Sequence, residues 1–296
     1  MKIRETAAAA GKIDWGHLIP RSVAVFLLVL ALGGPARASG KSGCRAGEGR
    51  VTKKVAGFEI VLGRDPDDET HEASCQATVL DRNQKAIFTE HDHAFFIVLA
   101  GKDVNGDGVP DVILEGYSGG AHCCWTYYFI SLGAHPGRIT QLENERDIAV
   151  YQNRKSGRIE FATLDGAFDY FDDLCHACTP FPAVYLRLED SRFVDIGPEH
   201  IADYDEIITE QKKTLTAREL QRFRALQTKP TEAEGKGETI FKVLTIVFAY
   251  LYSGREAQAH RALQDMWPPS DLERMWELIL ETRRNGVLSY TPPAMS

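Results

Sequence analysis

Residues 103–111 read DVNGDGVPD and lie between two strand-like runs, AFFIVL at 94–99 and DVIL at 111–114. Oxygen-bearing side chains recur at alternate positions and again at the end of the stretch, at Asp103, Asn105, Asp107 and Asp111. Hard cations such as calcium take about six to eight oxygen ligands, and a tightly curled acidic loop supplies them at this spacing. The stretch therefore predicts a calcium site on a loop between two strands.

The glycines of the loop support this interpretation. Gly106 and Gly108 allow the positive φ angles that tight curling requires, and the carbonyl of Val109 would add a ligand. The predicted calcium ligands are Asp103, Asn105, Asp107, Val109 and Asp111. The alternative is a metal-free polar hairpin whose Asn-Gly and Asp-Gly pairs form turns. Close carboxylates repel one another unless a cation neutralises them, which favours calcium.

The loop is not an EF-hand, since the twelfth position, where a bidentate Glu is needed, is Leu114. It resembles the calcium hairpins of integrin-alpha-type FG-GAP and VCBS-like repeats, in which such a loop joins two strands. Residues 103–132 also resemble a group of exported bacterial proteins of unassigned function. The resemblance implies an FG-GAP-like β-domain and no particular activity.

Short strand-like runs extend on both sides of the loop. They are rich in Val, Ile, Tyr and Phe and bounded by Gly, Asp and Pro, at 57–62, 94–99, 111–114, 125–132 and 183–186. We expect an α+β fold, with an antiparallel β-rich domain at 39–197 that forms a partial propeller or a sandwich. A complete propeller needs several repeats, and the sequence holds one complete loop.

A helical pattern follows, and it predicts a small α-helical domain at 198–296. Thr216 with Glu219 and Ser270 with Glu273 both have the spacing of a capping box. The apolar run at 240–252 ends at Ser253-Gly254, which is typical of a helix end.

The first 38 residues have the order of a secretory signal peptide. A basic start precedes the apolar run 23–32 and the triplet Ala36-Arg37-Ala38. The run is half the length of about 20 residues that spans a bilayer. We expect a cleaved signal at 1–38, a periplasmic or secreted protein, and no transmembrane anchor after cleavage.

All six cysteines follow the predicted signal: Cys44, Cys75, Cys123, Cys124, Cys175 and Cys178. An even number in an exported chain favours disulfides. We expect Cys44 to pair with Cys75, and the Cys123-Cys124 pair to bond with the 175–178 segment. The alternative is a zinc or redox site formed by His122-Cys123-Cys124 and the C-x-x-C at 175–178. A thioredoxin-like site is disfavoured because Thr179-Pro180 prevents a helix directly after the motif.

The charge balance excludes a general nucleic-acid binder, since 34 Lys and Arg face 42 Asp and Glu. We expect an exported calcium-binding protein with a structural or partner-binding role, whose partner is another protein or an envelope component. A secreted enzyme with an auxiliary calcium site and a Cys/His metal or redox protein are the alternatives. The acidic loop with Asp165, Asp169, Asp172 and Asp173 names no reaction.

Overall fold

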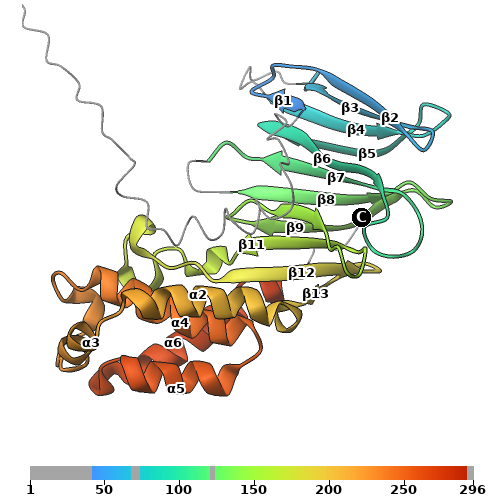
Figure 1. The fold of residues 1–296 in the computed structure, drawn as a ribbon. Helices are drawn as coiled ribbons and strands as arrows, with labels where there is room; N and C mark the ends of the chain where they lie inside the picture. The colour runs from blue at the N-terminus through green and yellow to red at the C-terminus, as the bar shows by residue number, and fades with distance from the viewer. Residues whose placement is uncertain (1–41, 68–73, 121–123, 292–296) are drawn as a thin grey trace, which may run out of the picture. The chain divides into compact units, whose positions relative to one another are not determined.

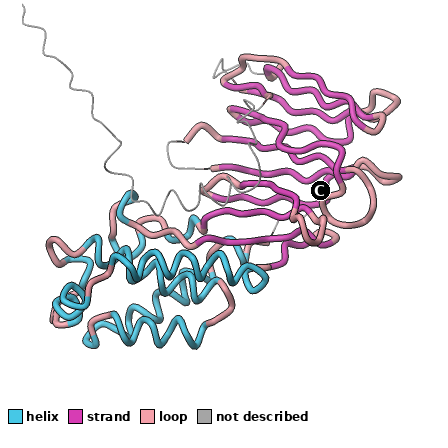
Figure 2. Tube along the Cα trace, viewed as in Figure 1, coloured by secondary structure: helices cyan, strands magenta, loops and turns pink. Residues whose placement is uncertain are grey.

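The computed structural model describes residues 42–67, 74–120 and 124–291. Within these ranges, 13 strands form three open antiparallel sheets, and five α-helices follow them (Figure 1). Figure 2 shows the same division of the chain into strands and later helices. The predicted α+β class with a β-rich N-terminal part is confirmed. The predicted signal peptide lies outside the described residues.

The first sheet is a meander that begins near the N-terminus of the described chain. Its strands, in spatial order, are β2 (Val51–Val55), β3 (Phe58–Arg64), β4 (Cys75–Leu80) and β5 (Ala86–Asp92). In β3, Phe58, Ile60 and Leu62 are buried and alternate with less buried residues. This period of two directs one face of the sheet towards a core.

The central sheet contains the predicted calcium loop. Its strands, in spatial order, are β1 (Gly43–Arg45), β6 (Ala94–Lys102), β7 (Asp111–Tyr117), β8 (Trp125–Ser131) and β9 (Gly137–Asn144). Tyr128 packs on Phe88 of the first sheet with ring centroids 5.2 Å apart, and Phe129 packs on Phe161 of the third sheet at 5.4 Å. Both faces are therefore covered, which explains why β7 is buried from Asp111 to Gly116 without alternation.

The third sheet joins the central sheet to the helices. Its strands, in spatial order, are β10 (Ala149–Gln152), β11 (Ile159–Leu164), β12 (Ala183–Glu189) and β13 (Arg192–Asp195). Phe161 faces the central sheet, whereas Tyr185 packs edge-on against Tyr204 of the first helix at 5.5 Å. The alternation along each strand thus divides its side chains between two cores.

The helices are α2 (Ile201–Thr214), α3 (Ala217–Arg224), α4 (Gly237–Tyr252), α5 (Glu256–Met266) and α6 (Leu272–Arg284). Helix α4 is the central one: most of its residues are buried, and Phe248 packs against Phe168 with centroids 4.6 Å apart. No helix in the described ranges is both long enough and apolar enough to cross a membrane.

One of the two predicted capping boxes is present. Thr216 accepts a hydrogen bond from the Glu219 amide, and the Glu219 side chain accepts one from the Thr216 amide. The prediction of a capping box at Ser270 is wrong, because α6 begins one residue later than that box requires, after Asp271. The hydroxyl of Ser270 instead donates to the carbonyl of Leu226.

Candidate metal centre

The predicted calcium loop joins β6 to β7 in the central sheet. The two strands are antiparallel, and Lys102 pairs with Asp111 at the base of the loop. Gly106 has φ 88° and Gly108 has φ 83°, in the left-handed region that favours glycine. The strand–loop–strand context expected from the sequence is confirmed.

Three acidic side chains converge inside this loop. One carboxylate oxygen from each of Asp103, Asp107 and Asp111 lies within 4.8 Å of the others. Within the described ranges, no other three His, Cys, Asp or Glu side chains come together in this way. The chain therefore brings three of the five predicted ligands to a common point.

Backbone amides of the loop orient the two exposed carboxylates. Asp103 accepts hydrogen bonds from the amides of Gly106 at 2.6 Å and Gly108 at 3.0 Å. Asp107 accepts one from the amide of Val109 at 2.8 Å. These bonds hold the carboxylates in place and leave further lone pairs for a ligand, since each carboxylate has about four acceptor sites.

Asp111 is the buried member of the cluster, with 0% of its surface exposed. Its Oδ2 accepts a hydrogen bond from the amide of Val104 at 2.8 Å, whereas its Oδ1 has no hydrogen-bond partner among the described residues. Burial, together with the charges of Asp107 and Asp103, raises the pKa of Asp111 to about 6, against the lowering effect of the hydrogen bond from Val104. A buried carboxylate oxygen beside two other carboxylates is the arrangement that a bound cation would complete.

Of the other two predicted ligands, the Asn105 side chain has hydrogen-bond partners within the protein. The Asn105 Oδ1 accepts from the amide of Asp107 at 3.2 Å, and its Nδ2 donates to the carbonyl of Asp190 at 3.0 Å. Val109 is half-buried, with its side chain beside Gly133. Asn105 thus anchors the loop to the turn between β12 and β13.

Arg158 attaches the loop to a second hairpin of the third sheet. Its guanidinium donates to the carbonyl of Asn105 at 3.1 Å and lies directly against Gly106. A Cβ atom at Gly106 would be 2.5 Å from the Arg158 Nη2 atom, so the guanidinium would have to move away if residue 106 carried a side chain. Through Arg158 and Asp190, the loop of the central sheet touches both the β10–β11 and the β12–β13 turns.

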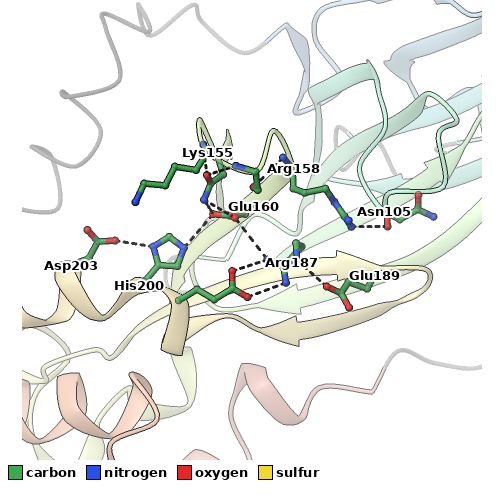
Figure 3. A network of polar contacts seen from close by, with 11 residues as sticks. Asn105, Lys155, Arg158, Glu160, Arg187, Glu189, His200 and Asp203 are labelled. Carbon is green, nitrogen blue, oxygen red and sulfur yellow. Dashed lines mark hydrogen bonds and ion pairs between the residues drawn. The ribbon is translucent and has the colours of Figure 1, made fainter.

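A buried polar network, which the sequence did not indicate, continues from the β10–β11 hairpin (Figure 3). Glu160 on β11 is 0% exposed, and both of its carboxylate oxygens accept hydrogen bonds from Asn153, at 2.8 and 3.0 Å. Its Oε2 also lies 3.2 Å from the Nε2 of His200, whose Nδ1 is 2.8 Å from Asp203 on α2. The network links the third sheet to the first helix.

The geometry at His200 indicates an imidazolium. Each ring nitrogen faces a carboxylate, and the ring stacks on Tyr185 at 4.1 Å with an interplanar angle of 5°. Burial lowers the pKa of His200, but the hydrogen bonds and charges of Asp203 and Glu160 outweigh it and raise the pKa above its ordinary value. Two N–H donors are needed to satisfy both carboxylates, and only the protonated ring has them.

The cysteine predictions are partly confirmed. Cys44 and Cys75 form a disulfide that connects β1 of the central sheet to β4 of the first. The predicted bonding of Cys175 and Cys178 to the Cys123-Cys124 pair is wrong, because Cys175 and Cys178 are bonded to each other. Cys123 lies outside the described residues. A disulfide offers no thiolates, so this segment does not contribute Cys ligands to zinc in this state.

The remaining candidate residues are used in ion pairs and hydrogen bonds. His176, between the two bonded cysteines, is held by Asp169 at 2.8 Å. Asp165 is buried and accepts from the Tyr252 hydroxyl at 2.7 Å. Asp172 pairs with Arg274 at 2.8 Å. These contacts connect the segment at 165–176 internally and to the helices.

Comparison of the chain with protein-family models, with curated proteins and with solved structures finds no match.

Proposed function

We propose that the chain is an exported calcium-binding protein in which the ion at residues 103–111 stabilises the contact between the central and third sheets. The observation that carries the proposal is the Oδ1 atom of Asp111, buried and without a hydrogen-bond partner among the described residues, beside the carboxylates of Asp103 and Asp107. Without a cation, this group keeps a raised pKa and a desolvation cost.

The size of the cluster supports calcium. Oxygen ligands lie about 2.3–2.6 Å from a calcium ion, so two of them can be about 5 Å apart at most. The three carboxylate oxygens lie within 4.8 Å of one another, which fits this limit. The resemblance to FG-GAP and VCBS-like hairpins agrees with the same ion.

The position of the loop supports a structural role for the ion. Asn105 and Arg158 connect the loop to two turns of the third sheet. Binding a cation would restrict the loop to the conformation that makes these contacts. Because an ion that binds only the folded state stabilises it by mass action, calcium would strengthen the sheet-to-sheet contact.

Export is supported by the sequence pattern of residues 1–38 and by the two disulfides, which persist in oxidising compartments. We propose a periplasmic or secreted location and a structural or partner-binding role towards a protein or envelope component. Fractionation of cells that express the full chain would test the location. Retention of the chain in the cytoplasm would contradict it.

Calorimetric titration of the chelator-treated chain with calcium chloride tests the metal site. We expect saturable binding of one ion, and loss of binding in Asp111→Asn, which keeps the size of the side chain. The matched control is Asp265→Asn, an exposed aspartate on α5 that should leave binding unchanged. No heat of binding at millimolar calcium in the folded parent protein would refute the proposal.

A further inference from the structure

The disulfide between Cys175 and Cys178 connects residues close in sequence, whereas the disulfide between Cys44 and Cys75 connects two sheets. It joins residues three positions apart within the loop between β11 and β12. A disulfide stabilises a protein mainly by restricting its unfolded chain, and it does so more when it closes a longer loop. Cys44–Cys75 closes a separation of 31 residues and ties two sheets, whereas Cys175–Cys178 ties no distant segments.

The two disulfides also differ in their access to solvent. Cys44 and Cys75 are 0% exposed and belong to the core between the first and central sheets. Cys175 and Cys178 are both exposed, as is Ala177 between them. Thiol–disulfide exchange requires a thiolate to reach a sulfur atom, so a soluble reductant can reach only the second bond without opening the fold.

Contacts other than the disulfide hold the turn at 175–178. Leu174 before it and Thr179 after it are buried, with 6% and 3% exposed. The carbonyl of Cys175 accepts hydrogen bonds from the amides of Cys178 at 2.7 Å and Thr179 at 3.1 Å, and from the Thr179 hydroxyl at 3.2 Å. These bonds would keep the two cysteines adjacent after reduction, so that the disulfide could form again.

From these contrasts we propose that Cys175–Cys178 is a reversible thiol–disulfide exchange site that reacts with dithiols. This function is separate from the calcium site.

A thiolate of the dithiol attacks one cysteine sulfur, which forms a mixed disulfide and releases the other cysteine as a thiolate that takes up a proton. The second thiol of the dithiol then attacks the dithiol sulfur of the mixed disulfide. This closes a disulfide within the dithiol and releases the second cysteine as a thiol. Two electrons and two protons pass to the protein, and the dithiol becomes a disulfide.

The short spacing explains the preference for dithiols. After a monothiol attacks, the released cysteine stays beside the mixed disulfide and displaces the monothiol again. A dithiol completes the exchange within its own molecule before this return step competes. The same proximity would let the reduced pair transfer its electrons to the disulfide of another molecule.

Reduction of the folded full chain tests the proposal, with the core disulfide as the internal control. The chain is incubated with dithiothreitol or with reduced glutathione at equal thiol concentration, and free thiols are alkylated and located by mass spectrometry. With dithiothreitol we expect Cys175 and Cys178 to open at least about tenfold faster than Cys44 and Cys75, while circular dichroism stays unchanged. With glutathione, the reduced pair should not accumulate. Equal opening rates for the two bonds, or opening only on unfolding, would refute the exchange site, and equal reduction by glutathione would refute the dithiol preference.

Two further arms examine reversibility and independence. The reduced chain is treated with oxidised glutathione, and we expect the Cys175–Cys178 bond to re-form; persistence of both thiols would contradict a reversible site. Cys178→Ser should instead retain a mixed disulfide with glutathione at Cys175, because the displacing thiol is absent. Asp111→Asn should undergo the same exchange as the parent chain, so loss of calcium binding and loss of exchange are distinguishable.

Discussion

The guanidinium of Arg158 donates a hydrogen bond to the carbonyl of Asn105 at 3.1 Å, across 53 residues of sequence. The bond joins the acidic loop of the central sheet to the β10–β11 hairpin of the third sheet. It places the positive charge of Arg158 against the loop backbone at Asn105 and Gly106, and no ion pair joins Arg158 to the three carboxylates among the described residues. The loop is therefore held from outside while its oxygens stay directed inwards.

Arg158→Ala should weaken this attachment. Loss of one partly buried charged hydrogen bond should lower the free energy of unfolding by about 1–2 kcal/mol, which urea denaturation can measure. The matched control is Arg154→Ala in the same hairpin, since Arg154 is exposed. Equal effects of the two substitutions would show that the Asn105 contact contributes nothing.

Gly106→Ala should cost more stability than Gly108→Ala. Both glycines have positive φ, so alanine is strained at either position by about 1–3 kcal/mol. Only at Gly106 would the new Cβ meet a side chain, Arg158, whereas Gly108 faces open space. The Arg158 side chain would have to move and lose its bond to Asn105.

Denaturation of both glycine variants in the Arg158→Ala background gives the decisive comparison. The extra cost of Gly106→Ala should disappear there, because residues in contact are not additive. An extra cost that survives without the arginine side chain would contradict this explanation.

Stability of the ion-free chain should fall as the pH rises from about 4 to above 6. The folded pKa of Asp111 is raised to about 6, above its usual value near 3.8, so the folded state holds this proton more tightly than the unfolded state. The stabilisation by the protonated form is thus present at low pH and is lost as the pH rises through 6, by about 3 kcal/mol at most. Chemical denaturation in the presence of chelator measures it.

Calcium should reverse this trend, because it binds the ionised carboxylate. We expect a rise in melting temperature on calcium addition at pH 7.5 and almost none at pH 4.5. Asp111→Asn should show neither the pH step nor the calcium effect, and this comparison separates Asp111 from other groups that titrate in the same range. A calcium effect of equal size at both pH values would be inconsistent with Asp111 as a ligand.

His200→Gln should destabilise the chain at pH 5.5 more than at pH 9. The folded pKa of His200 is raised, so its contribution is complete below the unfolded pKa, about 6.5, and is lost as the pH rises through the folded pKa. Two charge-assisted bonds, to Glu160 and Asp203, suggest about 2 kcal/mol at the lower pH. His135→Gln, in an exposed turn, is the control. A loss that is independent of pH would mean that the ring acts by packing on Tyr185 alone.

Local patterns predicted local structure well. The strand–loop–strand arrangement at 103–111 and the cap at Thr216 depend on residues a few positions apart, and both are present. Ser270 and Glu273 have the same spacing, but the Ser270 hydroxyl donates a hydrogen bond to the carbonyl of Leu226, 44 residues away. A side chain with one donor takes the partner that packing brings closest, and no local rule contains that information.

Pairing between distant cysteines was predicted with mixed success for the same reason. The Cys44–Cys75 bond was expected, and it joins neighbouring sheets in the core. Cys175 and Cys178 are bonded to each other, because the turn between Leu174 and Thr179 brings their backbones together, with Cα atoms 4.9 Å apart. Six cysteines allow about fifteen pairings, and only the folded backbone selects among them.

The order of residues by itself determined the acidic loop, its curling glycines and the alternation of the strands, because these depend on chemistry and spacing within a few residues. Tertiary structure decided that Asp111 is buried, that Arg158 and Asp190 hold the loop, and that Glu160 meets His200. Each of these depends on which sheet faces cover one another, and residues 40 to 85 positions apart become neighbours only after the layers have packed.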